Sequence, residues 1–438
     1  MQKNKKINID EEEKRKNNQN IIKRITYTLA VLLALDLLSY VTIPGVDPKK
    51  LSVLASNPSL TMLSMFSGGG FSNFSVMSMG LSSYISAQII VQLLQAGVVP
   101  KWTEWSKQGQ AGREKLSQAT RVLTLILGFI QAVGIIAGIN EITDYGFLLD
   151  TSIWNFCIMG LLLTAGTFIA MFAGDMITEN GIGNGISVII AAGIVKRIPS
   201  MVRQFWGSVK TNISFHWNIL IITLIILIVM VLLIVWAYRS ELRLPIQYSR
   251  RETMTGKSSY LPLKIIVAGV VPIVFASSIL SIPQTILLMF ESSKNTTAYR
   301  VIQEFFTMNS NTGAVLYAVL IFLFSYLYSL VQIDPDKLAE NLEKQEAYIP
   351  SVYPGTPTAV FIKQKLYELD LPGSLVLSVI SLIPLIAANT LSPSLEMGLS
   401  GSSILILIGV VEDISRQIEG LKLSHQYQPI LNKEYSFD

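Results

Sequence analysis

Residues 218–237 read NILIITLIILIVMVLLIVWA, an apolar run without a single charged side chain. About 20 such residues in a helix cross the ~30 Å hydrocarbon core of a bilayer. The rest of the chain has a similar character, because 50% of its 438 residues are hydrophobic and only 15% are charged. Soluble proteins carry about a quarter charged residues. The sequence therefore predicts a membrane protein that crosses the bilayer many times.

Hydropathy divides the chain into ten predicted spans. Lipid-facing helices do not need Gly, Ser, Gln or Pro, whereas helices that face protein or a watery path tolerate them. Four spans rich in these residues are therefore expected to line a path, and six uniformly apolar spans should form the wall. The mixed spans lie near 75–96, 185–200, 265–291 and 402–418. The apolar spans lie near 25–43, 120–138, 154–174, 218–237, 312–333 and 372–389.

The positive charges predict the orientation. With the N-terminus in the cytosol, 26 of the 34 Lys and Arg residues fall in cytosolic segments, which places both termini inside. No cleavable signal peptide is expected, because the polar residues 1–24 lead directly into a full-length span. Residues 9–24 place acids three or four positions before bases, which favours a short helix, either on the membrane surface or as a solvated leader.

Few residues are suited to catalysis or metal binding. Cys157 is the one cysteine, and His216 and His425 are far apart, so a disulfide framework or a metal centre is not expected. The sequence has no G-x-x-x-x-G-K-[ST] loop and no paired carboxylates within a span. Asp36 is the main charge deep in a span, and one such charge does not make a coupled pump. We therefore expect no enzyme and no cofactor, and we expect a partner to supply energy.

Three segments between spans look functional. The segment 44–74 contains LTMLSMFSGGGFSNFS (60–75), which is too apolar for a free loop and too rich in glycine for a span. It is expected to be a re-entrant piece, with a loosely packed surface loop as the alternative. The basic loop 238–264 and the loop 334–371 are long for helix connections. Both are expected to serve partners, unless they are simple solvated linkers.

Six motifs in order resemble the SecY family of protein-conducting channels. The resemblance covers roughly residues 25–419, and six ordered motifs are far more specific than any one of them. They are YISAQIIVQLLQ (84–95), PKWTEWSKQGQAGREKLSQATR (100–121), ITENGIGNGIS (177–187), RLPIQYSRR (243–251), YLPLKIIVAGVVPIVFASS (260–278) and AENLEKQEAYIPSVYPGTPT (339–358).

The resemblance implies an all-α polytopic fold. Ten transmembrane helices would form two pseudo-symmetric five-helix halves, an inverted repeat around a central hourglass pore. The expected divisions are a cytosolic segment 1–24, an N-terminal half 25–210, a C-terminal half 211–419 and a cytosolic tail 420–438. The location would be the bacterial cytoplasmic membrane. The function would be to conduct unfolded preproteins across it and to release transmembrane segments sideways.

The resemblance also assigns residues to roles. A closed aliphatic ring excludes water, so a bare ion faces a large desolvation cost. Such a ring makes no hydrogen bonds to a passing chain.

The plug maps onto 60–74 and the lateral gate onto spans two and seven, where polar groups are expected to hydrogen-bond across the closed seam. Pro272 and Pro283 are expected to break span seven. The ring residues are Leu81, Ile85, Ile186, Ile190, Val274 and Ile406; the plug residues are Met65, Phe66, Gly68, Gly69 and Gly70; the gate residues are Ser86, Gln92, Ser277 and Ser278.

The implied partners are small SecE-like and SecG-like membrane subunits, a SecA-type ATPase motor, the ribosome, and unfolded preproteins with signal sequences. Arg243, Arg250 and Arg251 are the expected motor or ribosome contacts, because positive loops suit acidic motor surfaces and RNA alike. The family commonly has Arg where Tyr353 stands, and that Arg is tied to the motor. It also commonly has Arg at Asp36 and Asn at Ile266.

These departures are compatible with a subtype. Some Gram-positive bacteria have an accessory SecY that serves a dedicated motor and a few large cell-wall glycoproteins, and this chain fits that subtype as well as the housekeeping one. A secondary transporter for a small solute is the rival class, because it shares ten spans and broken helices. It predicts polar ligands at mid-membrane and short cytosolic loops, whereas this chain has an aliphatic waist and long basic loops. A hydrolase embedded in the membrane ranks lower, because neither histidine has a sequence partner.

Overall fold

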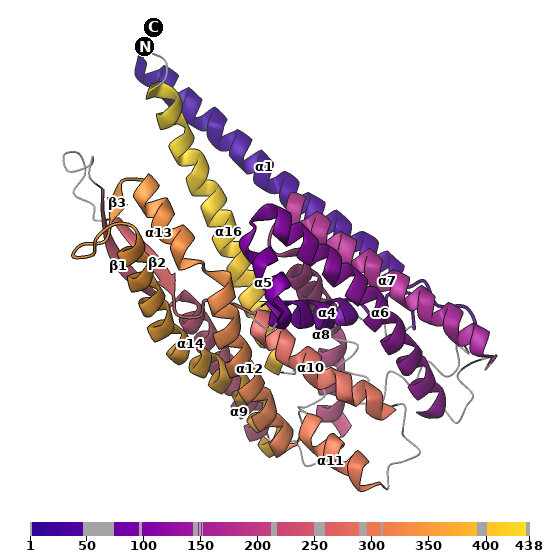
Figure 1. The fold of residues 1–438 in the computed structure, drawn as a ribbon. Coiled ribbons are helices and arrows are strands. Elements are labelled where there is room, and N and C mark those ends of the chain that lie inside the picture. Colours follow the sequence, from indigo (N-terminus) through magenta and orange to yellow (C-terminus); the bar gives the residue numbers. More distant parts are fainter. Residues whose placement is uncertain are drawn as a thin grey trace.

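The structure is a computed structural model that describes residues 2–46, 74–95, 99–142, 148, 150, 152–211, 217–248, 259–288, 296–307, 310–391 and 401–434. In these residues long helices form a bundle with one small sheet at one end (Figure 1). The helices are α1 (Gln2–Leu38), α4 (Ser82–Leu93), α5 (Pro100–Lys107), α6 (Gln110–Ile142), α7 (Ile153–Asn180), α8 (Gly185–Thr211), α9 (Trp217–Arg239), α10 (Val271–Leu288), α11 (Thr297–Phe306), α12 (Asn311–Gln332), α13 (Pro335–Lys344), α14 (Thr356–Leu391) and α16 (Gly401–Glu434).

Each predicted span coincides with a helix of this bundle. The apolar spans fall on α1, α6, α7, α9, α12 and α14, and the mixed spans fall on α4, α8, α10 and α16. Within the described residues, four stretches are long and apolar enough to cross a bilayer by length and hydropathy alone. They are Gln110–Asn140, Ile153–Asn180, Asn311–Ser329 and Thr356–Ile383. All four belong to the uniformly apolar group.

Two of the mixed spans contain less helix than predicted. Residues 74–81 and 265–270 are turns and bends, and α4 and α10 begin only after them. Gly80 and Gly269 adopt φ values of 51° and 61°, which glycine tolerates because it has no Cβ. The prediction that Pro272 breaks the span is wrong. Pro272 lies in the first turn of α10, where its missing N–H costs nothing, and Pro283 alone lies inside the helix.

Side-chain exposure separates the two groups of helices as predicted. On α1, Leu29, Leu33 and Leu37 repeat every four residues and are all exposed, so one stripe of the helix faces away from the protein. The helices α6, α7, α9, α12 and α14 also carry several exposed large apolar side chains. Among the described residues of the mixed helices such side chains are rare: Val195 on α8, Ile286 on α10 and Val411 on α16.

The two long loops join into one small folded unit, here called the platform. Its strands are β1 (Glu241–Tyr248), β2 (Ser259–Lys264) and β3 (Ala347–Tyr348), in the order β2-β1-β3, and both pairs are antiparallel. Together with α13 and the start of α14 they enclose a separate hydrophobic cluster. It consists of Leu244, Ile246, Leu263, Val267, Leu342, Ala347, Ile349, Ile362 and Leu366. The sequence predicts loops here; the structure shows a small sheet within these two loops, while the fold as a whole is all-α as predicted.

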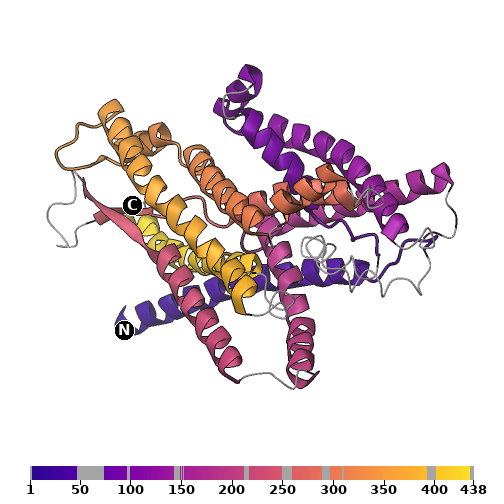
Figure 2. The ribbon, with the colours of Figure 1, turned by 90° about the horizontal axis from the view of Figure 1, so that it is seen from below.

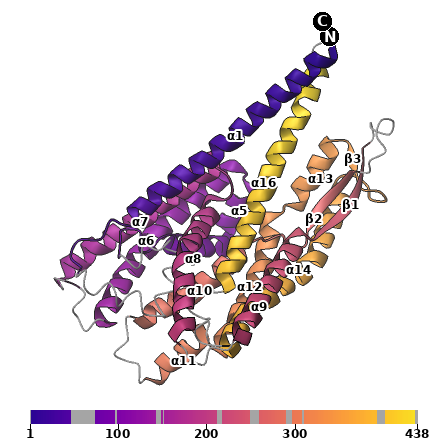
Figure 3. The same cartoon turned by 180° about the vertical axis from the view of Figure 1, so that it is seen from behind.

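The ends of the chain extend away from the bundle. The predicted N-terminal helix is continuous with the first span, and together they form α1. The helix α1 contacts α16, and the two converge toward the chain ends (Figures 1 and 3). On another side of the bundle α8 and α9 project together (Figure 2), and α16 contacts both. The helix α16 therefore bridges elements from the beginning, the middle and the end of the chain.

Glycines allow several helices to approach one another closely. A Cβ atom placed on Gly166 of α7 would lie only 1.9 Å from the carbonyl oxygen of Val76. The matched position is Gly420 of α16, where an added Cβ would meet nothing within 4 Å. We predict that Gly166→Ala lowers the free energy of unfolding by about 1–3 kcal/mol, because backbone must move to make room.

Gly420→Ala serves as the control for this prediction. It is expected to be neutral or to stabilise by about 0.5–1 kcal/mol, as alanine does in an open helical position. Thermal unfolding of the purified chains in detergent measures both effects. Equal melting temperatures for the two variants would contradict the close packing of α7 on the 74–81 segment.

Candidate functional site

The six predicted ring residues meet in one hydrophobic cluster, here called the central cluster. Five of them are buried, and Ile186 packs against them from its partly buried position. The cluster draws on α4, α8, α10 and α16, which are the four mixed helices, and on residues of the surrounding wall. Ile266, where the family commonly has Asn, is also buried in it. The six ring residues are Leu81, Ile85, Ile186, Ile190, Val274 and Ile406.

Local backbone structure directs these side chains inward. Ile85 N–H donates to the Leu81 carbonyl at 2.9 Å, so the two side chains lie one helical turn apart on the same face. At the start of α8 the Asn184 Oδ1 accepts from Ile186 N at 3.1 Å, which caps the helix. Gly183 before it has φ of 85°, and its N–H donates to Gln417 Oε1 of α16. The G-I-G-N-G motif thus anchors α8 against α16.

The predicted gate residues lie where α4 contacts α10. Ser86, Ser277 and Ser278 are buried, and Gln92 is partly buried. We expected hydrogen bonds across this seam, but the bonds of Ser86 and Ser277 run within their own helices. Ser86 Oγ donates to the Ser82 carbonyl at 3.0 Å, and Ser277 Oγ donates to the Ile273 carbonyl at 2.5 Å. Hydroxyls that bond to their own helix leave the seam without cross-links between these groups.

The Ser278 hydroxyl is the polar exception at the seam. Its Oγ is buried and has no hydrogen-bond partner in the described part of the chain. Nearby, Gln284 Nε2 donates to the Phe306 carbonyl at 2.7 Å, and this bond ties α10 to α11. The seam between α4 and α10 therefore depends mainly on apolar packing.

The predicted plug residues, 65–70, lie outside the described residues, but both ends of their segment are described. Ile43 N–H donates to the Phe74 carbonyl at 3.1 Å, and Val76 N–H donates to the Val41 carbonyl at 3.0 Å. These bonds form a short antiparallel bridge between Thr42 and Ser75. Ile43 and Phe74 are buried in a second hydrophobic cluster with residues of α6 and α7. The two described ends of the segment therefore lie side by side, packed on α6 and α7.

Asp36 has a partner, so the view of it as a lone charge is wrong. Its Oδ1 forms an ion pair with Lys196 Nζ of α8. The same ammonium donates to Ser39 Oγ at 2.9 Å and lies 4.8 Å from the centre of the Tyr40 ring. These contacts hold the end of α1, just before the plug segment, against α8. Sequence reasoning missed the pair because the partners are 160 positions apart.

The platform presents the described part of the predicted docking surface. Arg243 is exposed, pairs with Glu241 at 2.9 Å and lies over the Tyr260 ring at 4.8 Å. Tyr353 is 83% exposed at the tip of the loop before α14. Arg250 and Arg251 lie outside the described residues. The docking candidates Arg243 and Tyr353 thus both lie on the platform and not on the bundle.

Hydrogen bonds shape the platform at α13. Asp334 caps this helix by accepting from Asp336 N at 3.2 Å and from Lys337 N at 3.4 Å, and it also pairs with Lys337 Nζ at 3.0 Å. Partial burial opposes ionisation of this carboxyl, but the bonds from Lys337 outweigh it and lower the pKa of Asp334. The cap is therefore charged at neutral pH, which suits the positive end of the helix dipole.

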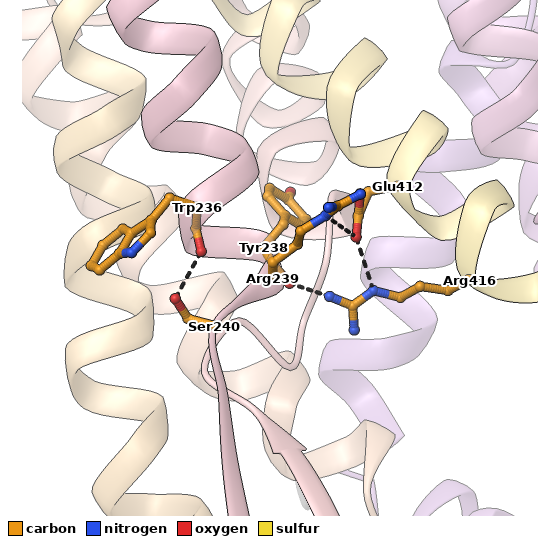
Figure 4. A network of polar contacts seen from close by, with 6 residues as sticks. All are labelled: Trp236, Tyr238, Arg239, Ser240, Glu412 and Arg416. Carbon is orange, nitrogen blue, oxygen red and sulfur yellow. Dashed lines mark hydrogen bonds and ion pairs between the residues drawn. The ribbon is translucent and has the colours of Figure 1, made fainter. Parts of the chain in front are cut away.

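Sequence reasoning also missed a polar network around the buried Glu412 at the end of α9. Glu412 of α16 lies between Arg239 and Arg416 (Figure 4), at 3.4 Å and 3.3 Å from their Nε atoms. Arg416 also donates to the Tyr238 carbonyl. An Arg four residues after a Glu is a visible helical signal, but the link to Arg239 needs the fold.

Comparison with known proteins agrees with this architecture. The SecY family model matches residues 75–415, which is most of the chain. The chain belongs to the SecY family. It is 55% identical to the protein translocase subunit SecY 2 of Lactobacillus kefiranofaciens subsp. kefiranofaciens, over 93% of this chain and 100% of that protein. It is 40% identical to SecY 1 of the same organism, over 94% and 96% of the two chains.

A solved structure supports the fold of this SecY-family chain independently. The structure described as that of a protein conducting channel superimposes with a TM-score of 0.68. The match covers 92% of this chain and 93% of the other, at 15% sequence identity. This SecY-family chain is accordingly a polytopic membrane protein and the pore-forming subunit of a protein translocase.

The ion pair of Asp36 provides a test of the SecY fold at the end of α1. We predict that Lys196→Met lowers the free energy of unfolding by about 1–3 kcal/mol, because it leaves a carboxylate without its cation. The pair is partly exposed, so the loss should fall below the 3–5 kcal/mol of fully buried pairs. Thermal unfolding in nanodiscs measures the change.

The double variant Asp36→Leu with Lys196→Met is the control. It removes both charges and is expected to recover most of the lost stability, since no group is then left unpaired. The single variant Asp36→Leu completes the comparison, and a double variant as unstable as the sum of the two single variants would contradict the pairing.

Proposed function

We propose that the central cluster is the constriction through which this translocase subunit conducts unfolded polypeptides. The observation that carries the proposal is that all six aliphatic side chains, from four segments far apart in sequence, belong to one hydrophobic cluster at the centre of the inner helices. Such a site offers no hydrogen bonds or charges, so it neither selects nor holds a particular passing sequence. Closed, it is dry, and a bare ion faces a large desolvation cost there.

The neighbouring segments support roles for a plug and a gate. The two ends of the plug segment are held together by the bridge between Thr42 and Ser75, which supports a role for this segment as one unit beside the central cluster. The α4–α10 contact is proposed as the lateral gate. Ser86 and Ser277 bond within their own helices, and hydrogen bonds in membranes contribute only about 1 kcal/mol in any case. An apolar signal segment can therefore compete for this seam.

We further propose the accessory subtype for this chain. It is 55% identical to SecY 2 and 40% identical to SecY 1 of one organism, which supports a place with the second type. The exposed Tyr353, at a position where the family commonly has Arg, supports a changed motor contact. In this proposal the chain exports a few cell-wall glycoproteins with a dedicated ATPase.

The remaining partners follow from the proposed role. A SecE-like subunit would clamp the two halves and a SecG-like subunit would complete the channel, while a SecA-type motor or the ribosome would bind the platform. The platform would face the cytosol of a bacterium. The outer ends of α1 and α16 carry the chain termini, which are expected to be cytosolic, and they project toward the same end of the molecule as the platform (Figure 1). Energy would come from that partner and not from this chain.

The proposed constriction predicts an ion leak when it is widened. We expect Ile85→Ala with Ile190→Ala to raise ion flux through reconstituted channels at least several-fold without any motor, because lost methyl groups let water enter. Current across planar bilayers, or dye efflux from proteoliposomes, measures the leak.

Ile130→Ala is the matched control for the constriction. Ile130 is 61% exposed on α6, so the same chemical change there should leave the flux unchanged. Equal leak from the control and the double variant, or no leak from either, would count against the constriction.

The proposed subtype predicts that Tyr353 influences the choice of motor. We expect Tyr353→Arg to leave thermal stability unchanged, since the side chain is 83% exposed. The variant should gain stimulation of a housekeeping SecA-type ATPase by roughly threefold to tenfold, as expected of one charged contact at an interface. Motor ATP hydrolysis in proteoliposomes, with the housekeeping and the dedicated motor compared side by side, decides between the subtypes. Housekeeping stimulation already maximal in the unmodified chain would refute the accessory assignment.

A further inference from the structure

A buried carboxylate connects α16 with the end of α9. Glu412 is only 9% exposed, and Arg239 and Arg416 hold it from two sides (Figure 4). Its Oε1 lies 3.4 Å from Arg239 Nε and 3.3 Å from Arg416 Nε. Burying a single carboxylate is costly, and two guanidinium groups offset that cost. The carboxylate is therefore held in one position by partners on both helices.

A second bond runs in the opposite direction between the same helices. Arg416 of α16 donates through Nη2 to the carbonyl of Tyr238, in the last turn of α9. The last carbonyls of a helix have no partner inside the helix and favour a cation. Since charge-assisted bonds are stronger than neutral ones, the end of α9 is firmly attached to α16.

The platform begins directly at this attachment point. Ser240 follows α9, and its Oγ donates to the Trp236 carbonyl at 2.7 Å. The Ser240 carbonyl accepts from Ile265 N at 3.1 Å, and Ile265 is the residue that follows β2. The two strands of the platform hairpin therefore enter and leave beside the network of Glu412. A displacement of the hairpin acts first on this point.

The same point is tightly packed against the central cluster. Gly409 lies between Ile406 and Glu412 on α16, and an added Cβ there would be 2.2 Å from Val270 Cγ2 and 3.0 Å from Tyr238 Oη. Glu412 is six residues from Ile406, or about 9 Å along the helix. Val274 lies one helical turn after Val270, and its N–H donates to the Val270 carbonyl at 3.3 Å. Two of the proposed constriction residues thus extend from this junction.

We propose that Glu412 is a positioning residue that couples the platform to the constriction. The inference rests on the proposed function, because it takes Ile406 and Val274 as constriction residues. A partner that displaces the platform moves the end of α9, and the network passes this movement to α16 as a rigid element. Ile406 then shifts relative to Ile190 of α8. Without the carboxylate the partner still binds, but the displacement of the platform moves the constriction residues less.

The test compares Glu412→Gln and Glu412→Asp with a matched control in proteoliposomes that contain an ATPase motor and a preprotein. The control is Glu340→Gln, which removes an exposed pair with Lys344 on α13 of the same platform. Motor affinity, thermal unfolding and the amount of preprotein moved per ATP hydrolysed are measured. We expect Glu412→Gln to keep motor affinity and to move about threefold to tenfold less preprotein per ATP.

Glu412→Asp keeps the charge and is expected to restore most of the coupling, while Glu340→Gln should match the unmodified chain. Arg239→Gln tests the same contact from the side of α9. The Arg239 side chain is 65% exposed, so its replacement disturbs the fold less and should uncouple in the same direction. A purely structural role would instead lower thermal stability and preprotein movement in parallel in Glu412→Gln, Glu412→Asp and Arg239→Gln. That result would overturn the inference.

The constriction and the coupling can fail separately. If Glu412→Gln moves as much preprotein per ATP as the unmodified chain, the inference is wrong even where Ile85→Ala with Ile190→Ala still leaks. If the leak is absent while Glu412→Gln uncouples, the constriction is misplaced, and Glu412 links the platform to α16 but not to the constriction proposed above.

Discussion

Close van der Waals packing between helices is the interaction on which the whole arrangement depends. Lipid is as apolar as the helix surfaces, so burial of apolar area does little to drive helices together inside a membrane. Small residues take over this role. Gly166 lets α7 approach the Val76 carbonyl, and Gly373 lets α14 approach the Ile265 carbonyl, where an added Cβ would lie at 2.1 Å. The central cluster forms because the backbones around it are allowed to come this close.

Polar bonds are arranged so that they do not interfere with this packing. Hydroxyls such as those of Ser86, Ser277 and Thr164 bond to carbonyls one turn back in their own helix. They are satisfied without linking one helix to another, so the contacts between inner helices remain apolar and separable. The described ion pairs between helices include Asp36 with Lys196 and Glu412 with Arg239, both away from the constriction residues. The bundle is thus held firmly at these points and weakly along the proposed gate.

Hydropathy predicted the spans and which of them carry many exposed apolar side chains, because both depend on average composition. It did not predict that 74–81 and 265–270 are turns, because buried turns and buried helices have the same apolar composition. The platform sheet had a readable signal, since Leu244 and Ile246 alternate with exposed residues as in a half-buried strand. No sequence signal pointed to the partners of Asp36 and Glu412 on other helices, because Lys196 and Arg239 are each more than a hundred positions away. Composition is local, whereas ion pairs between helices depend on the complete fold.

The separate core of the platform has a consequence for how this family can vary. Tyr353 lies in a loop that includes Ser351 with φ of 66°, and this loop stands on the cluster of Leu244, Ile349 and Ile362. A substitution in this loop would change the proposed docking surface without altering the central cluster, because the two cores share no residue. Only the junction at Glu412 and the ends of α9 and α10 need to remain compatible with both. Under the proposed function, a channel built this way acquires a different motor by changing its platform surface while its central cluster stays the same.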